Sequence, residues 1–223
     1  MRCIELVGGR VDIDGLNHLV DLPGPCVAVA NHMSMLDTFL LPMIMVPIKP
    51  TGFVIKKSLL DYPAFGAVLR QIDTIALTRA NPREDLRQVL SEGQRLLQAG
   101  VSLVIFPQAT RLPEFDPASF HTLGTKLAER ADVPLVPIAV KTSFQGNGRW
   151  FKDFGKIRPW DGVRVSVSAP ISTKPDSRAA HAQVVRTITE CLRDWEVAIR
   201  QAPPESPAQP TATRQPPINQ QPL

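Results

Sequence analysis

Short apolar runs rich in β-branched residues alternate with segments of helical periodicity along this chain, and this alternation constrains the fold more than any other feature. We expect strands at 27–30, 52–55, 74–77, 101–106, 135–141 and 163–168. Leucine and valine residues at helical spacing predict a helix over 86–97, which Gly100 ends. Further helices are expected at about 122–131 and 177–200. The pattern predicts a single-domain α/β fold with a central, mostly parallel or mixed sheet flanked by helices.

The length and composition of the chain indicate one domain followed by a tail. Its 223 residues, 43% of them hydrophobic, suffice for one sizeable core, which we assign to residues 1–200. The last stretch, 201–223, is rich in proline and glutamine and has almost no large apolar residue to bury. We predict a disordered tail there, and a passive terminus is favoured over a proline-rich ligand for another protein.

Charge and cysteine content narrow the class of protein. The formal net charge is +4, and the basic residues are spread along the chain. This balance suits an anionic lipid surface or a phosphorylated substrate and argues only weakly for nucleic acid. Cys3, Cys26 and Cys191 lie far apart without metal-ligand spacing. We therefore expect no disulfide framework and no metal site, in a reducing, cytosolic setting.

No segment carries the sequence signals of export or membrane insertion. The first residues lack an apolar h-region, and no window reaches the ~18 uninterrupted apolar residues of a spanning helix. Segment 39–48 is apolar, but it is too short to span a bilayer and contains Pro42 and Pro47. For this segment we favour a core helix over a lipid-facing or acyl-tunnel surface.

A polar Asn-His pair follows the first predicted strand, where α/β folds place ligand-facing groups. Asp37 lies five residues after His32. On a continuous helix this separation points the two side chains in different directions, so His32 must precede the helix if the carboxylate is to reach its ring. A carboxylate bound to one imidazole nitrogen fixes the tautomer and leaves the other nitrogen free to take a proton. The simpler alternative is a helix cap by Asn31 or Ser34, with the histidine on the surface.

The fourth predicted strand is followed by a turn with a cationic side chain. Pro107 ends the strand, and the turn brings Thr110 and Arg111 to the same sheet edge as the histidine. An arginine there can bind a phosphate through two parallel hydrogen bonds, which positions an anionic substrate next to the base. Alternatively, Arg111 is a surface residue paired with Glu114 or Asp116.

Together these segments resemble the glycerolipid acyltransferase superfamily, typified by 1-acylglycerol-3-phosphate (lysophosphatidic acid) acyltransferases. Four blocks occur in the family's order: Asn31-His32 with Asp37; Lys56-Lys57-Ser58-Leu59-Leu60 with Pro63, Gly66 and 75–79; 106–111; and 133–138. The resemblance covers roughly residues 4–170, and four ordered blocks are far more specific than any one of them alone.

The resemblance implies transfer of a fatty acyl group from acyl-CoA or acyl carrier protein to the 2-hydroxyl of lysophosphatidic acid, which gives phosphatidic acid in phospholipid biosynthesis. It implies no metal and no bound cofactor, with His32 as general base and Asp37 as its partner. Asn31 and Gln108 are expected to support the site. The side chains implied to hold the acceptor phosphate are Lys56, Arg79, Thr110 and Arg111. The implied setting is peripheral, at the cytosolic face of a membrane.

One departure from the family pattern keeps other functions open. Gln108 and Ala109 replace the usual Glu-Gly before Thr-Arg, which removes a negative charge and some backbone freedom. The alternatives are an acyltransferase for a different lipid acceptor and a non-catalytic lipid-binding protein of the same fold. A phosphate-binding hydrolase is less favoured, because the sequence has neither a Gly-x-Ser-x-Gly elbow nor a glycine-rich phosphate loop.

A second departure concerns the membrane. The sequence lacks the amphipathic or spanning N-terminal helices of many relatives. Either segment 39–48 contacts the bilayer, together with Trp150, Phe151 and Trp160, or the natural protein begins further upstream.

Overall fold

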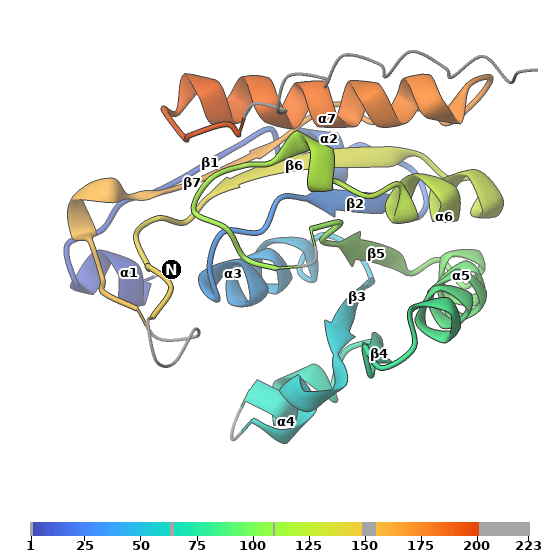
Figure 1. Ribbon diagram of the computed structural model, residues 1–223, viewed down its shortest axis with the longest axis horizontal. Helices are drawn as coiled ribbons and strands as arrows, with labels where there is room; N and C mark the ends of the chain where they lie inside the picture. The colour runs from blue at the N-terminus through green and yellow to red at the C-terminus, as the bar shows by residue number, and fades with distance from the viewer. Residues whose placement is uncertain (1, 63–64, 109, 149–154, 201–223) are drawn as a thin grey trace, which may run out of the picture.

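One seven-stranded sheet carries the fold, in the order β1-β7-β6-β2-β5-β3-β4 with helices on both faces (Figure 1). The computed structural model describes residues 2–62, 65–108, 110–148 and 155–200. The strands are β1 (Val11–Asp14), β2 (Val27–Ala30), β3 (Thr51–Lys56), β4 (Thr74–Leu77), β5 (Ser102–Ile105), β6 (Leu135–Lys141) and β7 (Val163–Val167). The α-helices are α1 (Arg2–Leu6), α2 (Asn17–Val20), α3 (Leu36–Met45), α4 (Phe65–Leu69), α5 (Pro82–Gln98), α6 (Leu123–Ala131) and α7 (Ser177–Asp194). Short 3₁₀ helices are η1 (Lys57–Asp61), η2 (Pro117–Ser119) and η3 (Pro159–Asp161). The predicted α/β fold with a mixed sheet is confirmed.

Five neighbouring strands run in the same direction, and this decides where functional groups gather. β2 pairs in parallel with β5 and β6, and β3 pairs in parallel with β4 and β5. β7 is antiparallel to β6, and β1 is parallel to β7, so these two strands run the opposite way. The carboxyl ends of β6, β2, β5, β3 and β4 therefore meet at one edge, where α/β folds bind ligands.

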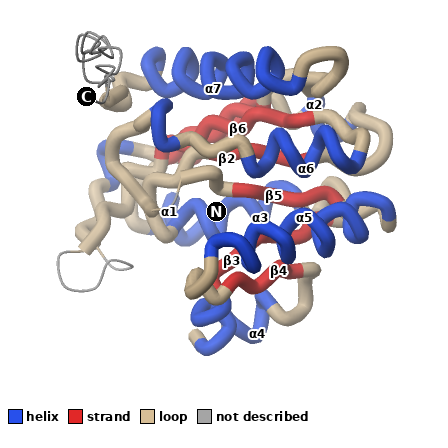
Figure 2. The backbone as a smooth tube through the Cα atoms, turned by 45° about the vertical axis from the view of Figure 1, so that its right-hand side comes forward, coloured by secondary structure: helices blue, strands red, loops and turns tan. Residues whose placement is uncertain are grey.

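Each face of the sheet has its own apolar core. On β2, Val27 and Val29 belong to the core beneath α5, α6 and α7. Ala28 and Ala30 belong to the core on the other face, beneath α3. α6 lies between α5 and α7 (Figure 2), and Gly124 lets it approach the sheet, because a Cβ atom there would lie 2.9 Å from a methyl group of Val29. Burial on both faces explains why the central strands are continuous apolar runs.

Local sequence signals set the bounds of α5. The side chain of Asn81 accepts hydrogen bonds from the backbone N–H groups of Arg83 and Glu84, at 3.1 and 3.4 Å. Pro82 occupies the first turn, where its missing N–H costs nothing. After the helix, Gly100 takes a φ of 85°, the left-handed conformation that glycine adopts most readily. The prediction that this helix ends before Gly100 is confirmed.

The first strand was not expected from the sequence. β1 has only four residues, and its two aspartates are exposed while Val11 and Ile13 are partly buried. Half of its residues are aspartates, which are depleted in strands, so the run carries little strand signal of its own. It becomes a strand because β7, which is distant in sequence, pairs with it.

The C-terminal helix is shorter than expected. α7 ends at Asp194 and not near residue 200. Glu196 takes a φ of 58°, and the N–H of Val197 donates to the carbonyl of Leu192 at 2.9 Å, which closes the helix. Beyond this turn the chain runs beside residue 115 and forms an isolated β-bridge with it. The helical periodicity of the preceding residues gave no sign of this turn.

The apolar run at 39–48 forms most of α3, and it has one buried face and one exposed face. Its buried side chains are Leu40, Leu41, Ile44 and Met45, and its exposed ones are Phe39, Met43 and Val46. The prediction of a core helix is therefore correct for one face only. No helix among the described residues is both long and apolar enough to cross a bilayer. The predicted tail at 201–223 lies outside the described residues, as do Trp150 and Phe151.

Candidate active site

Polar side chains from four strand ends meet at the carboxyl edge of the sheet. His32 follows β2, Arg79 follows β4, and the turn after β5 carries Thr110 and Arg111. Lys56 is the last residue of β3. These strands are neighbours in the sheet although they are far apart in sequence, so the edge collects groups from residues 32 to 111. Ala109 lies outside the described residues.

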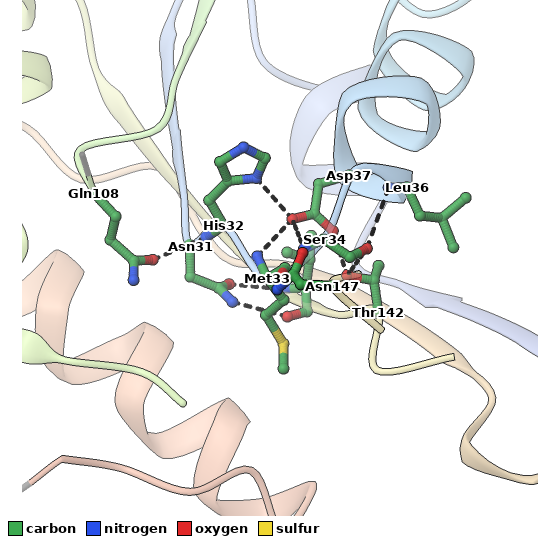
Figure 3. A network of polar contacts seen from close by, with 10 residues as sticks. Asn31, His32, Met33, Ser34, Leu36, Asp37, Gln108, Thr142 and Asn147 are labelled. Carbon is green, nitrogen blue, oxygen red and sulfur yellow. Dashed lines mark hydrogen bonds and ion pairs between the residues drawn. The ribbon is translucent and has the colours of Figure 1, made fainter. Parts of the chain in front are cut away.

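His32 and Asp37 form a hydrogen-bonded pair at the centre of this edge (Figure 3). His32 lies in the turn before α3, and Asp37 lies in the first turn of that helix. Their Nδ1 and Oδ2 atoms are 2.8 Å apart. The carboxylate is fully buried, while 17% of the imidazole is exposed. The pair is therefore closed on the Asp37 side and open to a ligand on the His32 side.

Asp37 is held by donors from the turn and from β6. Its Oδ2 also accepts the backbone N–H groups of Met33 and Ser34, at 2.6 and 3.1 Å. Its Oδ1 accepts the hydroxyl of Thr142, the residue that follows β6. An ionised carboxylate can only accept, so Nδ1 of His32 must carry the proton in this pair. The Nε2 atom of His32 is then the basic nitrogen.

The turn after β5 holds His32 in place. The side-chain oxygen of Gln108 accepts the backbone N–H of His32 at 2.8 Å, and the N–H of Leu112 donates to the carbonyl of His32 at 3.1 Å. The ring of Phe106 stacks on the imidazole, with centroids 4.3 Å apart and planes 25° apart. The substitution of Gln108 for the family's glutamate keeps the oxygen that accepts this N–H.

Asn31 joins the turn after β2, which also carries His32, to β6. Its Nδ2 donates to the carbonyl of Val140, and its Oδ1 accepts the N–H of Val140, both at 2.8 Å. The side chain is 1% exposed. A buried amide with both ends satisfied fixes the position of the following residue, His32, relative to the sheet. Asn31 therefore does not act here as a helix cap.

Two cavities meet at His32. The apolar cavity, of about 240 Å³, and the cationic cavity, of about 360 Å³, share His32, Thr38, Lys56, Leu59 and Arg79. The apolar cavity is further lined by Phe53, Val54, Ile55, Leu69, Leu77, Ile105, Phe106, Pro107, Gln108 and Leu123. The cationic cavity is further lined by Met35, Ser58, Tyr62, Thr110 and Arg111.

The cationic cavity has the composition of an anion site. Lys56, Arg79 and Arg111 line it, and no carboxylate is among its described lining residues. Arg79 has a φ of 60°, a left-handed conformation that costs energy in a residue other than glycine, and backbone strain of this kind clusters at functional sites. The carboxylates considered as alternative partners of Arg111, Glu114 and Asp116, both form ion pairs with Arg200.

The structure adds residues that the sequence did not single out. Thr142 binds Asp37, Phe106 stacks on His32, and Asn147 donates from its Nδ2 to the carbonyl of Met33 at 3.0 Å. Thr142 had a recognisable signal, because it is a polar residue directly after a buried strand. Phe106 had none, since a phenylalanine at a strand end is usually part of the core.

Comparisons with known proteins show the family to which this chain belongs. Residues 10–141 match the Acyltransferase family, and this chain belongs to that family. The chain is 34% identical over 188 residues to the 1-acyl-sn-glycerol-3-phosphate acyltransferase of Pseudomonas aeruginosa, covering 83% of this chain and 71% of that protein.

Two further proteins extend the comparison. The chain is 30% identical over 163 residues to the chloroplastic 1-acyl-sn-glycerol-3-phosphate acyltransferase BAT2 of Brassica napus, over 73% of this chain but only 45% of that protein. Its fold matches the crystal structure of the 1-acyl-sn-glycerophosphate (LPA) acyltransferase PlsC from Thermotoga maritima with a TM-score of 0.62 and 23% identity, over 85% of this chain and 75% of that one. This likeness shows that the two proteins share a fold.

Proposed function

We propose that this protein transfers a fatty acyl group from acyl-CoA or acyl carrier protein to the free hydroxyl of 1-acyl-sn-glycerol-3-phosphate, giving phosphatidic acid. The observation that carries the proposal is the position of His32 between an apolar and a cationic cavity. A fatty acyl chain needs an apolar cavity, and an acceptor phosphate needs cationic side chains. The names of the Pseudomonas and Brassica relatives support the same reaction.

The proposed chemistry is general-base catalysis by His32. Its Nε2 removes the proton of the acceptor hydroxyl while the oxygen attacks the thioester carbonyl of the donor. The tetrahedral intermediate collapses with cleavage of the C–S bond, and the imidazolium returns the proton to the thiolate. Asp37, buried and 2.8 Å from Nδ1, stabilises the imidazolium and keeps Nε2 directed at the substrate. Proton transfer of this kind contributes roughly 10²- to 10⁴-fold in rate.

The acceptor phosphate is assigned to the cationic cavity. Arg79 and Arg111 offer paired N–H donors that match phosphate oxygens, and Lys56 and Thr110 add further donors. We propose that these residues select a phosphorylated acceptor over a neutral one. The presence of Gln108 in place of the family's glutamate is no argument for a different acceptor, because the side-chain oxygen of Gln108 binds the backbone N–H of His32 and is not directed at a substrate in this proposal. The reaction in this proposal uses neither a metal nor a bound cofactor.

Assays of the purified protein with labelled acyl-CoA or acyl carrier protein test this proposal. The acceptors are lysophosphatidic acid and a monoacylglycerol of the same chain length, which lacks the phosphate. We expect phosphatidic acid from the first and little product from the second. Product from another lipid only would support the alternative acceptor. No product from any acceptor, together with tight binding to anionic vesicles, would support a lipid-binding protein.

We further propose that the protein contacts a membrane surface through α3. Phe39, Met43 and Val46 are 40, 53 and 41% exposed, and their spacing of four and three residues puts them on one side of the helix. Segment 38–60 contains three lysines and no acidic residue, which suits anionic phospholipids. Thr38, next to Phe39 in sequence, lines both cavities. A lipid acceptor would thus pass from the bilayer to the site, on the cytosolic side where acyl-CoA and acyl carrier protein occur.

Vesicle sedimentation with two matched variants tests the membrane surface. Met43→Asp places a charge on the exposed side of α3, and Leu86→Asp does so on α5, where Leu86 is 41% exposed. With phosphatidylglycerol vesicles we expect Met43→Asp to lose binding and Leu86→Asp to bind like the wild type. Equal losses in both variants, or no loss in Met43→Asp, would contradict the assignment.

A further inference from the structure

A chain of hydrogen bonds runs behind Asp37, on the side away from His32. The hydroxyl of Thr142 binds Oδ1 of Asp37. The hydroxyl of Ser34 lies 3.0 Å from Oγ1 of Thr142, and the backbone N–H of Leu36 donates to Oγ of Ser34 at 3.1 Å. Ser34, Asp37 and Thr142 are 0 to 1% exposed, so water does not compete for these groups.

The direction of this chain follows from the carboxylate. Since ionised Asp37 only accepts, Thr142 must donate its hydroxyl proton to Oδ1. The oxygen of Thr142 is then the acceptor for the Ser34 hydroxyl, and the oxygen of Ser34 accepts from the backbone of Leu36. Every proton points toward the carboxylate, and such a series polarises its members in the same sense. Among the described residues, Thr142 supplies the donor to Oδ1.

We propose that Thr142 is a positioning residue for acyl transfer. By holding Oδ1, it fixes the rotation of the carboxylate so that Oδ2 faces Nδ1 of His32 at 2.8 Å. Thr142 lines neither the apolar nor the cationic cavity, so it acts through Asp37 and not on a substrate. This inference rests on the proposed function, in which the pair of His32 and Asp37 performs the chemistry.

The placement of Thr142 is itself determined by the fold. The residue belongs to the segment after β6, whereas Asp37 belongs to α3. Two residues before Thr142, Val140 is joined to Asn31 by two hydrogen bonds of 2.8 Å. This junction sets the register between β6 and the turn of His32. The hydroxyl of Thr142 therefore reaches Asp37 from backbone that hydrogen bonds hold beside the turn of His32.

The isosteric variant Thr142→Val tests the proposal, with two controls from the same segment. We expect kcat to fall about tenfold, equivalent to ~1.4 kcal/mol of barrier, and KM for donor and acceptor to change less than about twofold, because neither cavity is touched. Thr142→Ser keeps the hydroxyl and should restore kcat. Ser143→Ala removes a neighbouring buried hydroxyl that has no hydrogen-bond partner among the described residues, and kcat should stay at the wild-type value.

Several outcomes would overturn the assignment. A wild-type kcat in Thr142→Val would do so, and so would a serine variant as slow as the valine variant, which would assign the effect to packing. The assignment would also be overturned if Ser143→Ala were as slow as Thr142→Val. If the wild type turns over no acceptor, the proposed function fails, and NMR then tests Thr142 alone. We expect the Nδ1 proton signal of His32 to shift or broaden in Thr142→Val and to stay in place in Ser143→Ala; an unchanged signal in both would refute the proposal.

Discussion

Replacing Gln108 with leucine should lower kcat while leaving the free energy of unfolding nearly unchanged. The change removes the oxygen that accepts the backbone N–H of His32 at 2.8 Å, and a buried N–H without an acceptor costs about 1–3 kcal/mol. The same change removes the amide nitrogen of Gln108, which is buried without a hydrogen-bond partner among the described residues. Its burial in the wild type costs a similar amount, about 1–3 kcal/mol. The two effects oppose each other, so we expect the free energy of unfolding to change by less than about 1 kcal/mol.

No such compensation applies to catalysis. Without the acceptor, His32 keeps the hydrogen bond from Leu112 and the stacking of Phe106 as its contacts with the β5 turn. We expect kcat of Gln108→Leu to fall about tenfold, or ~1.4 kcal/mol. In the matched control, Gln108→Glu, a carboxylate oxygen can accept the same N–H, so its kcat should exceed that of the leucine variant.

Urea unfolding and steady-state kinetics of the three proteins measure the two effects separately. Our reasoning is refuted if Gln108→Leu loses more than about 3 kcal/mol of unfolding free energy and keeps its kcat, because the amide would then support the fold and not His32.

Three further predictions concern the acceptor phosphate, the pH dependence of stability and the need for a metal ion. Arg111→Ala should raise KM for lysophosphatidic acid more than KM for the acyl donor, and equal increases would contradict its assignment to the acceptor phosphate. Burial lowers the pKa of His181 below its ordinary 6.5, against a smaller opposing effect of a hydrogen bond to the backbone of Phe120. As the pH falls below about 6.5, the unfolded chain therefore binds more protons at this histidine than the folded chain does. The free energy of unfolding decreases as a result. Unfolding at pH 7.5 and pH 5 should show a smaller decrease in His181→Gln than in the wild type, and an equal decrease would refute this. Finally, EDTA should leave turnover unchanged; a loss that added Mg²⁺ or Zn²⁺ restores would contradict metal-free catalysis.

The sequence predicts much of the fold because most elements carry their own signal. The expected strands at the centre of the sheet, β2, β5 and β6, are apolar runs buried on both faces, and α5 has both an Asn81 cap and Gly100 at its end. β1 lacks such a signal, since half of its residues are exposed aspartates and its strand character depends on β7. α7 was overestimated because its helical pattern continues into a turn that Glu196 makes with a positive φ.

The sequence predicts those parts of the site that depend on the spacing of residues along the chain. It does not predict those that depend on which strands are neighbours in the sheet. The interval between His32 and Asp37 required the histidine to precede the helix, as it does. That Thr142 would reach Asp37 could not be foreseen, because nothing in the sequence says that β6 lies beside β2. The role of Gln108 was hidden for a similar reason. Its oxygen binds the backbone of His32 in the turn after the neighbouring strand β2, and such a contact leaves no trace in a sequence pattern.

A single-turnover experiment with wild type and His32→Ala tests the central claim most directly. Excess protein is mixed with labelled acyl-CoA or acyl carrier protein and lysophosphatidic acid, and phosphatidic acid and free thiol are quantified over time. We predict one phosphatidic acid formed per thiol released by the wild type, and a rate lower by roughly 10²- to 10⁴-fold in His32→Ala. Formation of phosphatidic acid by His32→Ala at the wild-type rate would contradict the account.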